Sequence, residues 1–113
     1  PTGIFNERAQ QLITRFIPET TTETDAQALD LAIKACLRNG ITGFHDAGTS
    51  RENIELFKRF KSEGRLHTRL YVMITGWDSP LIYEYFRKGP EIDSAHLLTI
   101  RSIKLNCDGA LGS

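Results

Sequence analysis

Apolar runs at helical spacing alternate strictly with short β-prone runs, and this alternation limits the possible folds more than any other feature. Each helical run ends at a glycine, Gly40, Gly64 or Gly89, a residue type that commonly ends helices. The strands expected after these helices span residues 41–45, 69–74 and 98–105. Because helical crossovers connect parallel strands, the order predicts an α/β fold with a parallel sheet covered by helices.

Candidate capping residues indicate where each helix begins. Thr22 with Asp25 resembles a capping box, and Ser50 can cap the second helix. Ser79-Pro80 suits the first two positions of the third helix. The apolar faces expected to be buried comprise Leu12, Ile13, Phe16 and Ile17 near the N-terminus, then Leu29, Ile33, Cys36 and Leu37, then Ile54, Phe57 and Phe60, and last Leu81, Ile82, Tyr83, Tyr85 and Phe86.

The number of β/α units is too small for a closed barrel. A (β/α) barrel needs eight strands and roughly 250 residues, whereas this chain has 113 residues and about three predicted strands. Three parallel strands alone would leave two strand edges unpaired. We therefore expect parallel β/α units that form a partial TIM-like (β/α) barrel, with flanking helices and with residues 1–113 as a single segment.

Composition excludes several classes of partner. Lys plus Arg and Asp plus Glu each number 14, so no basic surplus is available for nucleic acid. No apolar run approaches the roughly 20 residues that cross a bilayer, and the first residues do not resemble a signal peptide. Cys36 and Cys107 form no CxxC pair, which favours a reduced, cytoplasmic protein. From the charge balance and the short apolar runs we expect neither a membrane nor a nucleic-acid partner.

Functional groups of parallel α/β folds gather where strands end, and Lys104 is the most informative residue there. It lies between Ile103 and Leu105 in an apolar strand, where desolvation of an ammonium group is costly. A neutral lysine amine can be a nucleophile, a base or a target for carboxylation by carbon dioxide. The alternative is a lysine whose ammonium group extends to solvent from a half-exposed strand.

Four further residues are candidates for a substrate pocket: His45, Asp46, Trp77 and Asp108. His45 and Asp46 are adjacent, so within a strand they would point to opposite faces, and both can equally be structural. Trp77 beside a helix cap can be a packing residue. Asp108 before Gly109 is by default a turn former. Residue chemistry alone therefore names no reaction.

Three sequence blocks resemble landmarks of amidohydrolase family 3, in its YtcJ-like branch. The blocks are Pro1–Ile4 (PTGI), Gly40–Gly48 (GITGFHDAG), and Ile103–Leu105 (IKL) followed by Asp108–Ser113 (DGALGS). They occur in the family's order, and the resemblance spans essentially the whole chain.

The resemblance implies a divalent-metal-dependent hydrolase with a TIM-like barrel that acts on C–N bonds, other than peptide bonds, of small amide-type substrates. It implies that Lys104 is the metal-bridging lysine, carboxylated at Nζ, on the fourth barrel strand. The implied metal is zinc, bound in the full-length parent. The fragment alone is expected to be inactive and need not bind a metal.

The other ligands that the family implies fall outside the chain. The HxH pair of the first barrel strand would precede residue 1, and the later histidines and the final aspartate would follow residue 113. His45, His67 and His96 lack the spacing of such a pair. Asn106 and Cys107 depart from the family pattern, which leaves details of the pocket undetermined.

Two other classes of function remain open at this point. A small receiver-like signalling domain would use Asp46 as phospho-acceptor and Lys104 as its partner, although the acidic pair after a first strand is missing. A non-catalytic module could instead self-associate through its open sheet edges.

Overall fold

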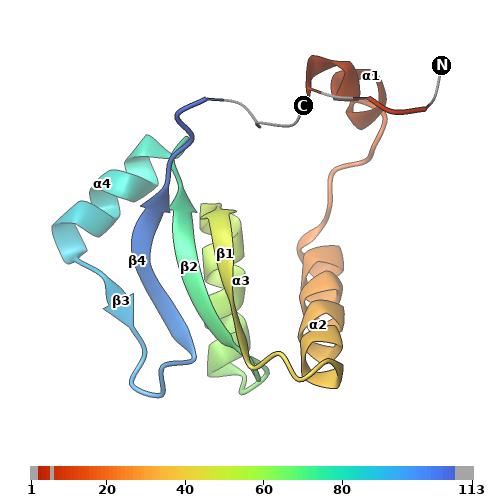
Figure 1. Ribbon diagram of the computed structural model, residues 1–113. Helices are drawn as coiled ribbons and strands as arrows, with labels where there is room; N and C mark the ends of the chain where they lie inside the picture. The colour runs from red at the N-terminus through yellow and green to blue at the C-terminus, as the bar shows by residue number, and fades with distance from the viewer. Residues whose placement is uncertain (1–2, 6, 109–113) are drawn as a thin grey trace.

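The computed structural model describes residues 3–5 and 7–108, which form one sheet and the helices that cover it (Figure 1). In chain order the elements are a 3-10 helix (Glu7–Gln10), α1 (Gln11–Thr14), α2 (Thr22–Arg38), β1 (Gly43–Thr49), α3 (Arg51–Ser62), β2 (Arg69–Thr75), α4 (Ser79–Lys88), β3 (Glu91–Ile92) and β4 (Leu98–Lys104). The predicted order of helices and strands is confirmed.

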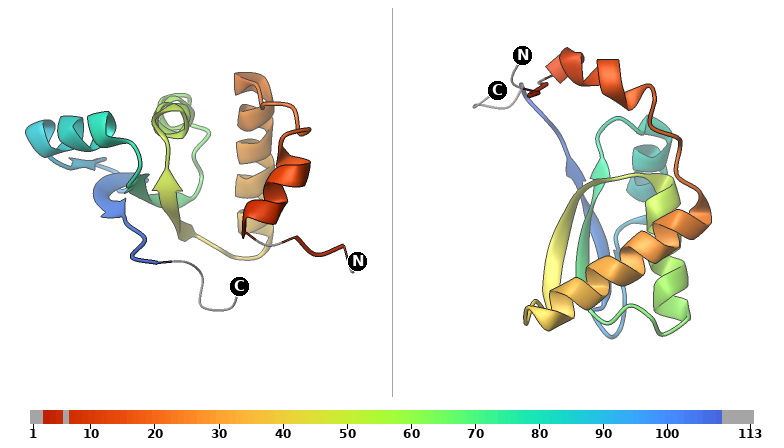
Figure 2. Two further views of the ribbon diagram at one scale, coloured as in Figure 1. Left: turned by 90° about the horizontal axis from the view of Figure 1, so that it is seen from above. Right: turned by 90° about the vertical axis from the view of Figure 1, so that its right-hand side faces the viewer.

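The sheet has the strand order β1-β2-β4-β3, and its first three strands are parallel. Helices α2, α3 and α4 all lie on one side of this sheet, and no helix of the described residues covers the opposite, bare face (Figure 2). The short β3, which the sequence did not predict, pairs antiparallel with β4. The predicted α/β class with parallel β/α units is therefore confirmed, and the described residues form an open sheet.

The core lies between the sheet and its helix layer. Val72 and Ile100 of the sheet and Phe60 of α3 are completely buried. Each such side chain contributes about 1.5–3 kcal/mol to folding through removal of apolar surface from water. The predicted inward positions Ile54, Phe57 and Phe60 are confirmed, as are Leu29, Ile33, Leu81 and Tyr85.

Other predicted core residues are exposed. Leu37, Tyr83 and Phe86 lie on the solvent side of their helices, because each helix contacts the sheet along only one narrow face. The N-terminal apolar residues Leu12, Ile13, Phe16 and Ile17 are also exposed, and α1 lies away from the sheet (Figure 1). The prediction that this segment covers a core edge is wrong for the described residues.

Two helices begin one residue earlier than predicted. The cap of α2 is Thr21, whose hydroxyl accepts from the Thr24 amide at 3.2 Å, so the predicted box at Thr22 is wrong by one residue. The cap of α4 is Asp78, whose carboxylate accepts from the Leu81 amide at 2.9 Å. Only Ser50 caps its helix, α3, as predicted.

Two strand irregularities decide which side chains reach the bare face of the sheet. In the pairing of β2 with β4, Val72 is opposite Ile100 but Met73 is opposite Ser102, so Arg101 is an extra residue. In β1, Gly48 is skipped in the same way between Ala47 and Thr49.

The extra residue in β4 reverses the alternation of its side chains. Ile100 and Ile103 pair with the core residues Val72 and Ile74, so both lie on the helix-covered side. Lys104 consequently lies on the bare side, although simple alternation from Ile100 would turn it toward the helices.

Ion pairs join the elements on the helix-covered side of the sheet. Glu84 of α4 accepts from Arg51 of α3 at 2.7 Å and from Lys88 at 3.0 Å. Hydrogen bonds from Arg51 and then from Lys88 lower the pKa of the Glu84 carboxyl from its usual 4.5 to about 2. Glu91 of β3 pairs with both Lys58 and Lys88, which ties the short strand to the helices.

No helix in the described ranges is both long and apolar enough to span a lipid bilayer.

The extra residue in β4 leads us to expect that deletions in β4 and β2 have different effects on folding. Deleting Arg101 should leave a folded chain, because Ser102 and Lys104 stay on the bare face and Ile103 stays on the helix-covered side. Deleting Met73 from β2 is the matched control, since it would turn Ile74 out of the core. Circular dichroism and thermal melting should show a cooperative transition for the first deletion and none for the second. Equal loss of folding in both would contradict the assigned register.

The lowered pKa of Glu84 leads us to expect that this residue contributes to the pH dependence of the unfolding free energy. A folded-state pKa of about 2, below the usual 4.5, means that its contribution is complete above pH 4.5 and is lost toward pH 2. Glu84→Gln should therefore flatten the decline of unfolding free energy between pH 4.5 and 2, as measured by urea titrations. Glu19→Gln, at an exposed residue without an ion pair among those described, should keep the wild-type slope. An unchanged slope in Glu84→Gln would refute the assigned ion pairs.

Candidate functional site

Lys104 is the last residue of β4, at the edge of the sheet where the parallel strands end. It pairs with Thr75, the last residue of β2, and its side chain is exposed on the bare face. The desolvation expected from its apolar sequence neighbours is therefore absent from the described structure, because no layer covers this face. The alternative of a lysine extending to solvent describes Lys104 as it stands in this chain.

Two glycines adjoin Lys104: Gly76, directly after the end of β2, and Gly48 of β1. The Gly76 amide donates to the Lys104 carbonyl at 3.0 Å, and a Cβ at residue 76 would lie 2.7 Å from that oxygen. A Cβ at Gly48 of β1 would lie 3.9 Å from Cγ of Lys104. Gly76 thus allows the close approach of the β2 and β4 ends, and Gly48 lies beside the lysine side chain.

His45 lies in the middle of β1, away from the strand ends. The predicted strand end at His45 is wrong, because β1 continues to Thr49. The His45 ring stacks on Tyr71 of β2 with 4.7 Å between centroids. Since Tyr71 precedes Thr75 by four residues, roughly 13 Å of strand separates His45 from the level of Lys104. The structure does not bring these two candidates together.

Asp46 has a structural partner. It points to the helix-covered side, opposite to His45, as adjacent strand residues should. Its carboxylate accepts a hydrogen bond from the Thr49 hydroxyl at 2.7 Å, and Thr49 is buried. This bond bridges the extra residue Gly48 and so holds the irregular end of β1.

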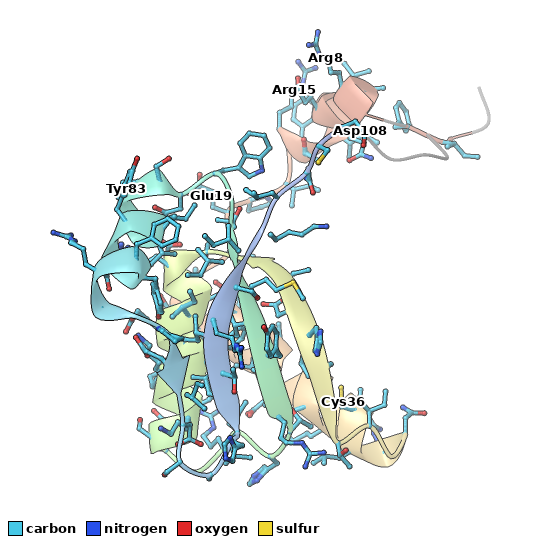
Figure 3. All side chains as sticks on the ribbon, turned by 60° about the vertical axis from the view of Figure 1, so that its left-hand side comes forward. Arg8, Arg15, Glu19, Cys36, Tyr83 and Asp108 are labelled. Carbon is cyan, nitrogen blue, oxygen red and sulfur yellow. The ribbon has the colours of Figure 1, made fainter. Side chains whose placement is uncertain are left out.

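The remaining candidates lie on segments that follow the strands. Trp77 follows β2 and is 85% exposed, so the expected packing against a helix cap does not occur. Asp108 is exposed on the extension beyond β4, away from the sheet (Figure 3). Residues 109–113, which complete the block that begins at Asp108, lie outside the described residues.

The donor set of the described residues does not by itself fit a metal ion. Among residues 3–5 and 7–108, no three His, Cys, Asp or Glu side chains come together as a metal site would require. The described chain can therefore offer one candidate ligand, and a complete site would need donors from elsewhere.

Sequence reasoning missed the roles of Gly48 and Gly76 beside Lys104, and it missed the contact of Tyr71 with His45. Gly48 and Gly76 follow β-prone runs and look like ordinary turn glycines. Their proximity to Lys104 arises from strand pairing over more than 25 residues, which no local pattern reports. Tyr71 lies two residues before Met73, so period-two alternation puts both on one face, but the pairing of Tyr71 with His45 depends on the register between β1 and β2.

The chain matches the sequence model of the amidohydrolase family over residues 1–113, its whole length. Comparisons with curated proteins and with solved structures find no match. The family predicted from the blocks around Gly40–Gly48 and Lys104 is thereby confirmed. The chain belongs to the amidohydrolase family.

Proposed function

We propose that this chain is a β/α segment of an amidohydrolase barrel and supplies one metal ligand, Lys104, to its active site. The family is generally metal-dependent and acts on small molecules. The proposed reaction is hydrolysis of a C–N bond in a small amide-type substrate, by the assembled barrel and not by the segment alone.

The placement of Lys104 is the observation that carries this proposal. Active sites of (β/α) barrels lie at the carboxyl ends of the strands. Lys104 lies at that end of β4 and on the face without helices, which is the side that becomes the interior when such a sheet closes. The extra residue Arg101 is what brings a lysine, instead of a core residue, to this position.

The winding of the chain argues against a receiver-like signalling domain. Receiver-type sheets are doubly wound, with helices on both faces and a reversal in strand order. Here the parallel strands follow one another as β1, β2 and β4, and the helices cover one face (Figure 2). Asp46, the phospho-acceptor of that alternative, is in mid-strand and bonded to Thr49.

Zinc is the metal that we propose for the assembled barrel. Lys104 would serve as an oxygen ligand after its neutral Nζ attacks carbon dioxide and loses a proton, which gives a carbamate. Zinc accepts carboxylate-type oxygen together with histidine nitrogen, the donors that this family combines. His45, Asp46, Trp77 and Asp108 remain proposed pocket residues. Cys36 and Cys107 are both free thiols, in agreement with the cytoplasmic location that we also propose.

Assays of the purified chain test the segment proposal. With zinc chloride and bicarbonate added, the 113-residue chain should hydrolyse no amide or related C–N substrate above the rate of buffer with zinc, because one ligand cannot hold a catalytic metal. Lys104→Met serves as the control and should give the same background. Robust zinc-dependent turnover that Lys104→Met abolishes would overturn the segment proposal, although it would support Lys104 as a ligand.

A self-associating chain is a second proposal, which the open sheet favours. Among the described strands β1 pairs with β2 alone, and no described helix covers the face opposite the helix layer. Unpaired strand edges are templates for pairing with another chain. We propose that the chain at high concentration pairs through these edges with a second copy.

Sedimentation equilibrium tests this association. The mass of the chain should rise with concentration above the 12.7 kDa of a monomer. Replacing Ala47 of β1 by Lys would add charge at the exposed edge strand and should lower the association. A well-folded monomer at all concentrations would contradict self-association.

A further inference from the structure

We propose that Gly48 is a positioning residue for Lys104, and that the absence of a bulky side chain at this residue lets the lysine lie across the carboxyl end of the sheet. The inference rests on the proposed role of Lys104 as a ligand. Gly48 is on β1 and Lys104 on β4, so β2 lies between them in the sheet.

The distance between the two residues shows how the sheet is shaped at this end. Adjacent strands are about 4.8 Å apart, so strands on either side of a third are about 10 Å apart in a flat sheet. Yet a Cβ at Gly48 would be only 3.9 Å from Cγ of Lys104. The ends of β1 and β4 therefore approach each other over the bare face, and the lysine side chain leans from β4 toward β1.

The backbone conformation of Gly48 is consistent with this close approach. Gly48 has φ of +101°, in the region that favours glycine, and it is the extra residue of β1. The hydrogen bond from Thr49 to Asp46 spans this residue and joins two side chains that both lie on the helix-covered side. Strand irregularities of this kind often re-aim residues beside active sites.

A side chain at residue 48 would have a graded effect on Lys104. The Cβ of alanine would make an ordinary contact with the lysine, at 3.9 Å from its Cγ. The two additional methyl groups of valine would take up space beside the lysine and displace its side chain. Both variants would also strain the backbone because of the positive φ.

Gly40 offers a matched control for backbone strain. It has φ of +71°, and a Cβ added there would meet nothing within 4 Å. Gly40→Ala and Gly40→Val therefore reproduce the conformational strain without a contact to Lys104. A change that appears only in the Gly48 variants reports on the lysine and not on loss of stability.

Nuclear Overhauser spectroscopy on the complete 113-residue chain tests the inference. Gly48→Ala should show a cross-peak between the new methyl group and the Lys104 side chain. Gly48→Val should shift the Lys104 side-chain resonances and remove their cross-peaks to Thr75, which both Gly40 variants should retain. Absence of the alanine cross-peak in a folded Gly48→Ala protein would overturn the inference. Unchanged Lys104 resonances in folded Gly48→Val would overturn it as well.

Labelling with carbon-13 bicarbonate at a fixed pH adds a readout of the modified lysine. A carbamate carbon signal assigned to Lys104 should be weaker in Gly48→Val than in Gly40→Val, and equal signals would count against a positioning role. If Lys104 forms no carbamate in any variant while the cross-peaks behave as expected, carboxylation of Lys104 in this chain fails and the Gly48 contact stands. The two failures are therefore distinguishable.

Discussion

The structure depends on burial of apolar side chains between one face of a parallel sheet and a single layer of helices. Phe60 of α3 and Val72 and Ile100 of the sheet are completely buried between these two layers, and each contributes on the order of 2 kcal/mol to folding. One-sided burial keeps the strands in sequential order and leaves the opposite face bare. That bare face carries Lys104, so the asymmetry of the core also sets the position of the candidate ligand.

Periodicity and glycine stops predicted the order of the elements because both follow from local chemistry. Ile54, Phe57 and Phe60 recur at helical spacing and do line the core. Local pattern could not predict the extra residues Gly48 and Arg101, which arise from pairing with a partner strand. Because of the extra residue in β4, Lys104 changes face.

The candidate site was predictable in its type but not in its arrangement. Sequence reasoning identified Lys104, and the family resemblance gave it a role as ligand. Sequence reasoning also placed His45 at a strand end, whereas in the structure His45 lies in mid-strand and packs against Tyr71. Asp46, another candidate, holds the irregular strand end through Thr49. Around Lys104 the described chain supplies glycines that make room, and a metal site would take its other ligands from further strands.

The intact mass of the natural polypeptide that carries these residues tests whether the chain is a segment of a larger barrel. A closed (β/α) barrel requires roughly 250 residues, more than twice the length of this chain. Mass spectrometry of the protein isolated from its source should therefore find a polypeptide at least that long, with bound metal. A native 12.7 kDa polypeptide that hydrolyses amides by itself would contradict the account.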